Sequence, residues 1–183
     1  MDAQQHNKQP RVAVVYASVT GNTRLVAAAL AESTGDPLLS VKELADPAAF
    51  DVLALGFWVR RGQPDPASQA LWRRIQGRLT FWFGTLGAWP WSEHADKCRQ
   101  AATALLAGGG NTVLGGFLCQ GRVSVPASSK HPMTPERMAR LAEAAHHPDA
   151  QDLAAAAQAW MAARETALRR LQACPDGRCG KTL

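Results

Sequence analysis

Three hydroxyl side chains and a glycine follow an apolar run close to the N-terminus. The run at residues 11–16 is rich in β-branched residues, and the next segment contains Ser18, Val19, Thr20, Gly21, Asn22 and Thr23. An Ala- and Leu-rich helical segment begins directly afterwards. Glycine allows the backbone to turn sharply, and the free amides and positive dipole end at the start of a helix attract anions. We therefore predict that residues 18–23 bind a phosphate group.

This loop has no lysine. Sites for nucleoside triphosphates end in Gly-Lys-Ser/Thr, and dinucleotide sites use Gly-x-Gly-x-x-Gly, but the loop matches neither pattern. A hydroxyl-rich loop without a cation suits one terminal phosphate monoester, as in a mononucleotide. An ordinary strand-turn-helix unit with a well-capped helix remains the alternative.

The length and composition of the chain favour one domain. It has 183 residues, of which 46% are hydrophobic, and this suits a single substantial core. We expect one domain over residues 1–173, with a core at 11–120 and a helical extension at 135–173, followed by a mobile tail at 174–183. No apolar run is long enough to span a membrane and no secretion signal is evident, so we expect a cytoplasmic protein.

The cysteines and the charges carry little specific information. Four cysteines at positions 98, 119, 174 and 179 are too few and too unevenly spaced for a disulfide framework. The net charge is +5, but the basic residues are scattered and no nucleic-acid-binding motif accompanies them. We predict no metal site, no nucleic-acid partner and no membrane partner.

Apolar runs alternate with helical patterns along the chain. After the first strand we expect strands at residues 38–42, 50–56, 79–83 and 112–118, with helices at 24–30, 67–76 and 93–106 between them. Five strands interleaved with helices predict an α/β fold with a doubly wound parallel sheet and helices on both faces. In such sheets ligands bind beyond the carboxyl ends of the strands.

Two further loops follow strands and carry tryptophan. They lie at residues 56–62 and 84–91. Because the carboxyl ends of parallel strands meet at one edge of the sheet, these loops should converge on the hydroxyl loop.

The sequence resembles the flavodoxin family over roughly residues 11–120. Residues 18–23 match the family's phosphate loop, Ser/Thr-x-Thr-Gly-x-Thr, at every specified position. The resemblance implies strand order 2-1-3-4-5 with an added C-terminal helix, and FMN as the cofactor. It places the phosphate on Ser18, Val19, Thr20, Gly21, Asn22 and Thr23. It places the flavin ring against Phe57, Trp58, Val59, Arg60 and Gly62 in the second loop, and Thr85, Leu86, Gly87, Ala88 and Trp89 in the third.

The six tryptophans fall into two groups according to their positions in the sequence. Trp72, Trp82 and Trp160 lie at strand or helix spacing, which predicts core packing. Trp58, Trp89 and Trp91 lie in loops beside Gly or Pro. We expect at least one of these three to stack on the flavin.

The chain departs from ordinary flavodoxins in its charge and in its loops. Flavodoxins are acidic, whereas this chain is basic. It is more similar to a divergent subgroup with motifs matching residues 56–59, 83–88, 119–121 and 131–134. One branch of that subgroup resembles the flavodoxin-like accessory protein of bacterial bilirubin reductase. This implies a redox partner with an acidic docking surface, such as a bilirubin-reductase-type flavoenzyme.

Three functions remain compatible with the sequence. The preferred one is an FMN-binding electron-transfer protein that exchanges electrons with a partner enzyme and has no catalytic residues of its own. The alternatives are an NAD(P)H-dependent FMN quinone or flavin reductase and a flavin-free binding module. We also expect Arg60 or Arg61 to favour the anionic reduced flavin, and residues 119–134 to form a docking surface or a substrate site.

Overall fold

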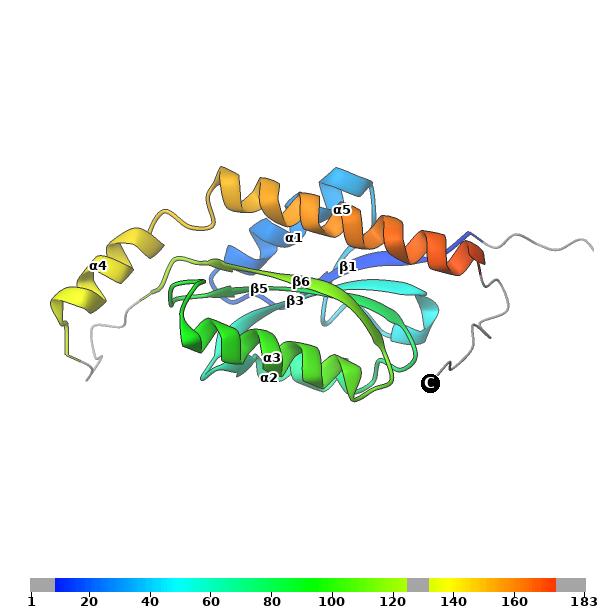
Figure 1. Ribbon diagram of the computed structural model, residues 1–183, viewed down its shortest axis with the longest axis horizontal. Helices are drawn as coiled ribbons and strands as arrows, with labels where there is room; N and C mark the ends of the chain where they lie inside the picture. Colours follow the sequence, from blue (N-terminus) through cyan, green and yellow to red (C-terminus); the bar gives the residue numbers. More distant parts are fainter. Residues whose placement is uncertain (1–8, 125–131, 174–183) are drawn as a thin grey trace, which may run out of the picture.

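The computed structural model describes residues 9–124 and 132–173, and its centre is a parallel β-sheet (Figure 1). The tail at 174–183, with Cys174 and Cys179, and the residues Lys130 and His131 lie outside the described residues. The strands are β1 (Val12–Tyr16), β2 (Leu38–Ser40), β3 (Val52–Arg60), β4 (Gln63–Pro64), β5 (Leu79–Leu86) and β6 (Thr112–Gln120). The helices are α1 (Asn22–Thr34), η1 (Pro47–Ala49), α2 (Pro66–Trp72), α3 (Glu93–Ala107), α4 (Pro135–Ala144) and α5 (Ala150–Ala173).

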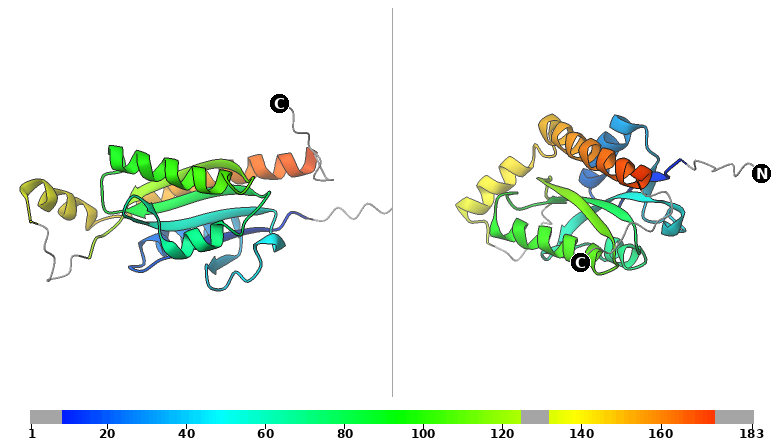
Figure 2. Two further views of the ribbon diagram at one scale, coloured as in Figure 1. Left: turned by 90° about the horizontal axis from the view of Figure 1, so that it is seen from below. Right: turned by 45° about the vertical axis from the view of Figure 1, so that its right-hand side comes forward.

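The five parallel strands have the order β2-β1-β3-β5-β6. Helices α1 and α5 cover one face of the sheet, and α2 and α3 cover the other (Figures 1 and 2). This arrangement confirms the predicted doubly wound α/β fold with a parallel sheet. The short β4 lies outside the parallel series, because it pairs only with the end of β3 and runs antiparallel to it. The flavodoxin-like strand order 2-1-3-4-5 is also confirmed, with β5 and β6 as its fourth and fifth members.

Each face of the sheet has its own apolar core. On the α2/α3 face Phe57 meets the edge of Trp72, with ring centroids 5.4 Å apart. On the α1/α5 face Phe81 packs on Trp160, at 5.7 Å. Trp72, Trp82 and Trp160 are all buried, which confirms that they belong to the core. Continuous apolar runs form these central strands because the sheet is covered on both sides.

Strand β6 is an edge of the sheet, and an irregularity interrupts it. Its pairing with β5 shifts by one residue between Val113 and Gly116, where Gly115 has φ +140°. The neighbouring Gly116 lies under the ring of Trp82, and a Cβ there would come within 2.0 Å of that ring. The indole of Trp82 is fixed by a 3.0 Å hydrogen bond from its Nε1 to Thr103 of α3.

The C-terminal part is helical from residue 135, as predicted, and consists of the two helices α4 and α5. Helix α5 packs along α1 (Figure 1). Arg164 of α5 binds Asp36 through two guanidinium nitrogens at 2.8 Å each.

No helix in the described ranges 9–124 and 132–173 is long and apolar enough to cross a membrane.

Candidate functional site

The hydroxyl loop leads into the first helix through a left-handed glycine. Gly21 has φ +92° and immediately precedes α1, and no side chain caps the start of this helix. The Oγ of Ser18 accepts a hydrogen bond from the Gly21 amide at 3.1 Å, while Thr20 is exposed and Val19 is 76% exposed. An uncapped helix start beside exposed hydroxyls is suited to binding an anion.

The last two residues of the loop point into the protein. The Nδ2 of Asn22 donates to the Arg122 carbonyl at 2.8 Å. The Oγ1 of Thr23 lies 2.9 Å from the Oγ1 of Thr85, and Thr23 is only 1% exposed. These two side chains join the loop to neighbouring elements, so Ser18 and Thr20 carry the loop's solvent-accessible hydroxyls.

The second predicted loop is a tight hairpin. Strand β3 continues to Arg60, and Arg61 (φ +51°) and Gly62 (φ +79°) make the turn into β4. Phe57 is buried in the core, so its side chain is not available to a ligand. Trp58 is half-buried and Arg60 is exposed.

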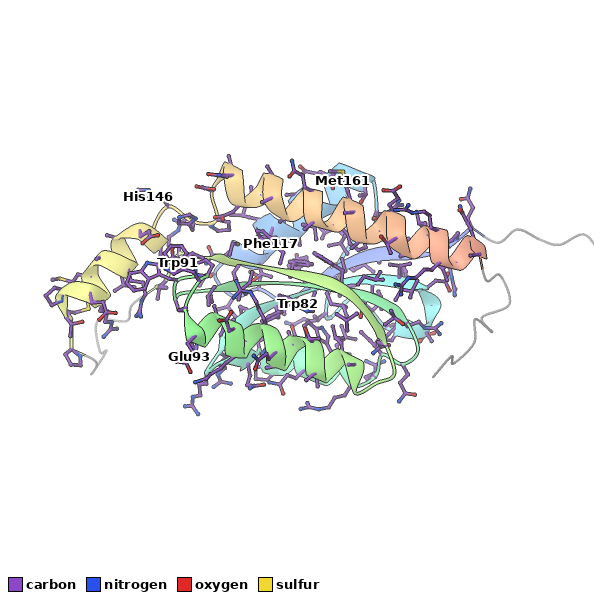
Figure 3. The ribbon with its side chains drawn as sticks, viewed as in Figure 1. Trp82, Trp91, Glu93, Phe117, His146 and Met161 are labelled. Atoms are coloured by element: carbon purple, nitrogen blue, oxygen red, sulfur yellow. The ribbon has the colours of Figure 1, made fainter. Side chains whose placement is uncertain are left out.

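The third predicted loop begins at the buried end of β5. Thr85 and Leu86 are both buried, and Gly87 lies so close to Val123 that a Cβ would come within 2.4 Å of it. Trp89 stacks on Trp91 with ring centroids 6.3 Å apart. The Nε1 of Trp89 also donates to Glu143 of α4 at 2.6 Å. Trp91 is 72% exposed, at the end of the molecule that carries α4 (Figure 3).

A pocket of about 500 Å³ lies between the second and third loops and α4. Of the predicted ring-binding residues, it brings together Val59, Leu86, Gly87, Ala88 and Trp89. It is not lined by Phe57, Trp58, Arg60, Gly62 or Thr85, nor by the hydroxyl loop.

The segment after β6 links the hydroxyl loop to this pocket. The Gly121 amide donates to the Leu86 carbonyl at 2.9 Å, and the carbonyl of Arg122 accepts from Asn22. Val123 lines the pocket against Gly87. The start of the predicted functional segment 119–134 therefore contacts both halves of the candidate site.

Helix α4 supplies pocket residues that the sequence did not identify. Arg137, Arg140 and Leu141 line the pocket. Arg61 of the hairpin, one of the two arginines expected near the flavin, lines it too, whereas Arg60 does not. The Nε of Arg140 is buried and has no hydrogen-bond partner within the described ranges. The spacing of Arg137 and Arg140 by three positions on an amphipathic helix was the available signal, because residues three apart share one helix face.

A second cluster of polar side chains lies where α5 begins. His147, Asp149 and Asp152 have ligand atoms within 4.8 Å of one another. Asp149 accepts from the Asp152 amide at 2.8 Å, and Asp152 accepts from the Asp149 amide at 3.0 Å and contacts the Nδ1 of His147. The hydrogen bond to Asp152 raises the pKa of His147. This reciprocal pattern is a helix cap.

Comparison with known proteins finds relatives by sequence and by fold. The chain is 26% identical over 156 residues to the flavodoxin-like domain-containing protein BilS of Clostridioides difficile, covering 76% of this chain and 88% of BilS. Its fold is similar to oxidised flavodoxin 2 of Bacillus cereus (17% identity, 85% and 99% of the two chains, TM-score 0.59). It is also similar to an archaeal flavodoxin (18% identity, 85% and 97%, TM-score 0.53). The flavodoxin domain family matches residues 13–161, and the chain belongs to that family.

Proposed function

We propose that this protein binds FMN and transfers electrons to or from a partner redox enzyme. The observation that carries the proposal is the start of α1, where Gly21 turns the chain and no side chain caps the helix. Such a helix start favours a phosphate. The flavodoxin family, to which the chain belongs, typically binds FMN.

The residues present fit the two ends of this cofactor. The amides at the start of α1 and the hydroxyls of Ser18 and Thr20 would hold the phosphate. The pocket beside Val59 and Trp89 is largely apolar in its lining and would take the flat ring. Bound FMN supplies the capacity to accept and donate one or two electrons.

The proposed partner is a redox enzyme with an acidic docking surface, for example a bilirubin-reductase-type flavoenzyme. The net charge of +5 supports an acidic partner, because opposite charges speed the encounter of two proteins. Docking of this kind weakens as the salt concentration rises.

The visible absorption spectrum of the purified protein, with and without added FMN, tests cofactor binding. A flavin spectrum that remains with the protein after gel filtration supports the proposal. A protein that stays colourless at saturating FMN contradicts it.

Two matched variants test the phosphate site. Thr20→Ala removes an exposed hydroxyl, and Val19→Ala alters the adjacent exposed residue without removing a polar group. We expect Thr20→Ala to weaken FMN binding about tenfold, the loss of one hydrogen bond to a charged group. Riboflavin, which has no phosphate, should bind both variants as it binds the parent protein. Equal losses for FMN and riboflavin would contradict a phosphate contact at Thr20.

The carrier and reductase functions differ in how the flavin becomes reduced. A carrier is reduced only when a separate reductase is added. Steady oxidation of NAD(P)H by the purified protein with a quinone would identify a reductase instead.

A further inference from the structure

Arg140 is a positively charged residue that α4 contributes to the wall of the pocket. Its side chain lines the pocket, and its Nε is buried without an acceptor within the described part of the chain. Leaving a buried charged donor unpaired costs free energy, so such groups in folded proteins normally have a partner. No ion pair within the described ranges 9–124 and 132–173 neutralises the Arg140 guanidinium, so its positive charge lies unbalanced at the wall of the pocket.

The backbone that carries Arg140 is fixed at several points. The carbonyl of Arg140 accepts from the Nε2 of Gln120 at 3.4 Å. One turn further on, Glu143 accepts from the indole of Trp89, and Ala144 is fully buried. The start of α4 is capped by Thr134, whose Oγ1 accepts from the Arg137 amide. These contacts tie Arg140 to β6 and to the third loop.

The pocket has an excess of positive charge. Among the described residues, Arg61, Arg137 and Arg140 line it, against the single carboxylate of Glu136. A guanidinium stays protonated at every pH at which the protein is folded. Apolar neighbours such as Leu86 limit the screening of that charge by water.

We propose that Arg140 supplies the positive charge that stabilises the anionic, reduced flavin ring in this pocket. The inference deepens the proposed function and rests on it. Reduction adds two electrons and one proton to the neutral oxidised ring, which leaves one negative charge on the reduced ring. A nearby cation favours the charged form over the neutral one. Arg140 therefore raises the midpoint potential of bound FMN and strengthens binding of the reduced cofactor relative to the oxidised one.

Three variants test this role, with the midpoint potential of bound FMN as the readout. Arg140→Gln removes the charge, and Arg140→Lys keeps it. Arg170→Gln is the matched control, because Arg170 is an exposed arginine near the end of α5 that is far from α4 (Figure 1). Circular dichroism and a thermal melt establish that each variant is folded.

We expect Arg140→Gln to weaken binding of reduced FMN relative to oxidised FMN about tenfold, which lowers the two-electron midpoint by about 30 mV. Arg140→Lys should restore most of the difference, and Arg170→Gln should match the parent protein. A folded Arg140→Gln variant that binds FMN with the parent midpoint overturns the role of Arg140 alone. A parent protein that binds no FMN overturns the proposed function as well, so the two failures are distinguishable.

Discussion

The side-chain hydroxyls of Thr23 and Thr85 lie 2.9 Å apart inside the protein, although the residues are 62 positions apart in the chain. This contact joins the start of α1 to the end of β5. It holds the candidate phosphate site and the third loop at a fixed separation. The distance between the two ends of the candidate site is therefore built into the buried part of the protein.

Replacing either threonine with valine tests this contact. Thr23→Val or Thr85→Val keeps the shape and removes this hydrogen bond, so we expect each to destabilise the apoprotein by about 1–3 kcal/mol. Thr85→Val should be the milder change, because the Thr23 hydroxyl also donates to the Phe57 carbonyl at 3.5 Å. The double variant should cost less than the sum of the two, because neither hydroxyl is then left alone. Urea unfolding of all four proteins measures this coupling. Strictly additive losses would show that the two hydroxyls do not interact.

The ion pair between Asp36 and Arg164 should contribute strongly to the docking of α5. The side chain of Asp36 is only 5% exposed, so Arg164→Met leaves a buried carboxylate without its cation. We expect a loss of about 3 kcal/mol in the free energy of unfolding. The control is Arg169→Met, which breaks an exposed pair with Glu165 and should cost less than about 1 kcal/mol. Similar losses in both variants would contradict a special role for the buried pair.

The pair of His147 and Asp152 should make stability depend on pH. The hydrogen bond to Asp152 raises the pKa of folded His147 above its ordinary value of 6.5. Its stabilising effect is therefore complete below pH 6.5 and is lost as the pH rises through the higher pKa of the folded state. We expect His147→Gln to lose more stability at pH 6 than at pH 9 in urea unfolding. His146→Gln, which changes an exposed neighbouring histidine, is the matched control.

The two cysteines that the structure describes should be unreactive in the native protein. Burial raises the pKa of both the Cys98 and Cys119 thiols, and the nearby carboxylates of Asp152 and Asp149 raise that of Cys119 further. Only the thiolate is nucleophilic. In a Cys174→Ser/Cys179→Ser variant, Ellman's reagent should titrate no thiol until the protein is unfolded, and two thiols afterwards. Rapid labelling of the native variant would show that one of these sites opens.

The fold was predictable because its signals are local. The apolar runs at 11–16, 50–56 and 79–83 contain few polar residues, so they form central strands covered on both faces. The strand ends were less accurate. β3 extends four residues beyond the predicted end at Gly56, to Arg60. Phe57 and Trp58 extend the strand by pairing with β5, and Val59 and Arg60 extend it further by pairing with the two-residue β4. A pairing between strands is not encoded in the periodicity of either one.

The site was predictable only in part, because contacts between elements that are distant in the sequence are not encoded in local patterns. The sequence indicated that Leu86, Gly87, Ala88 and Trp89 lie in a loop after a strand ending at residue 83. In the structure β5 continues to Leu86, and the pocket includes all four residues. The sequence pattern did not distinguish side chains that face the pocket from side chains that face the core. Phe57, which was expected beside the flavin ring, faces the core. The contribution of α4 was missed because its position depends on tertiary contacts, such as the hydrogen bond between Trp89 and Glu143.

The irregular edge strand has a consequence for solutions of this protein at high concentration. An exposed strand offers unpaired backbone groups on which a second molecule can add a strand. In β6 the extra residue and the φ of +140° at Gly115 interrupt the straight run of donors and acceptors. At the opposite edge, β2 is only three residues long. Neither edge of the sheet is a good template for a strand of another copy, which limits self-association through strand pairing.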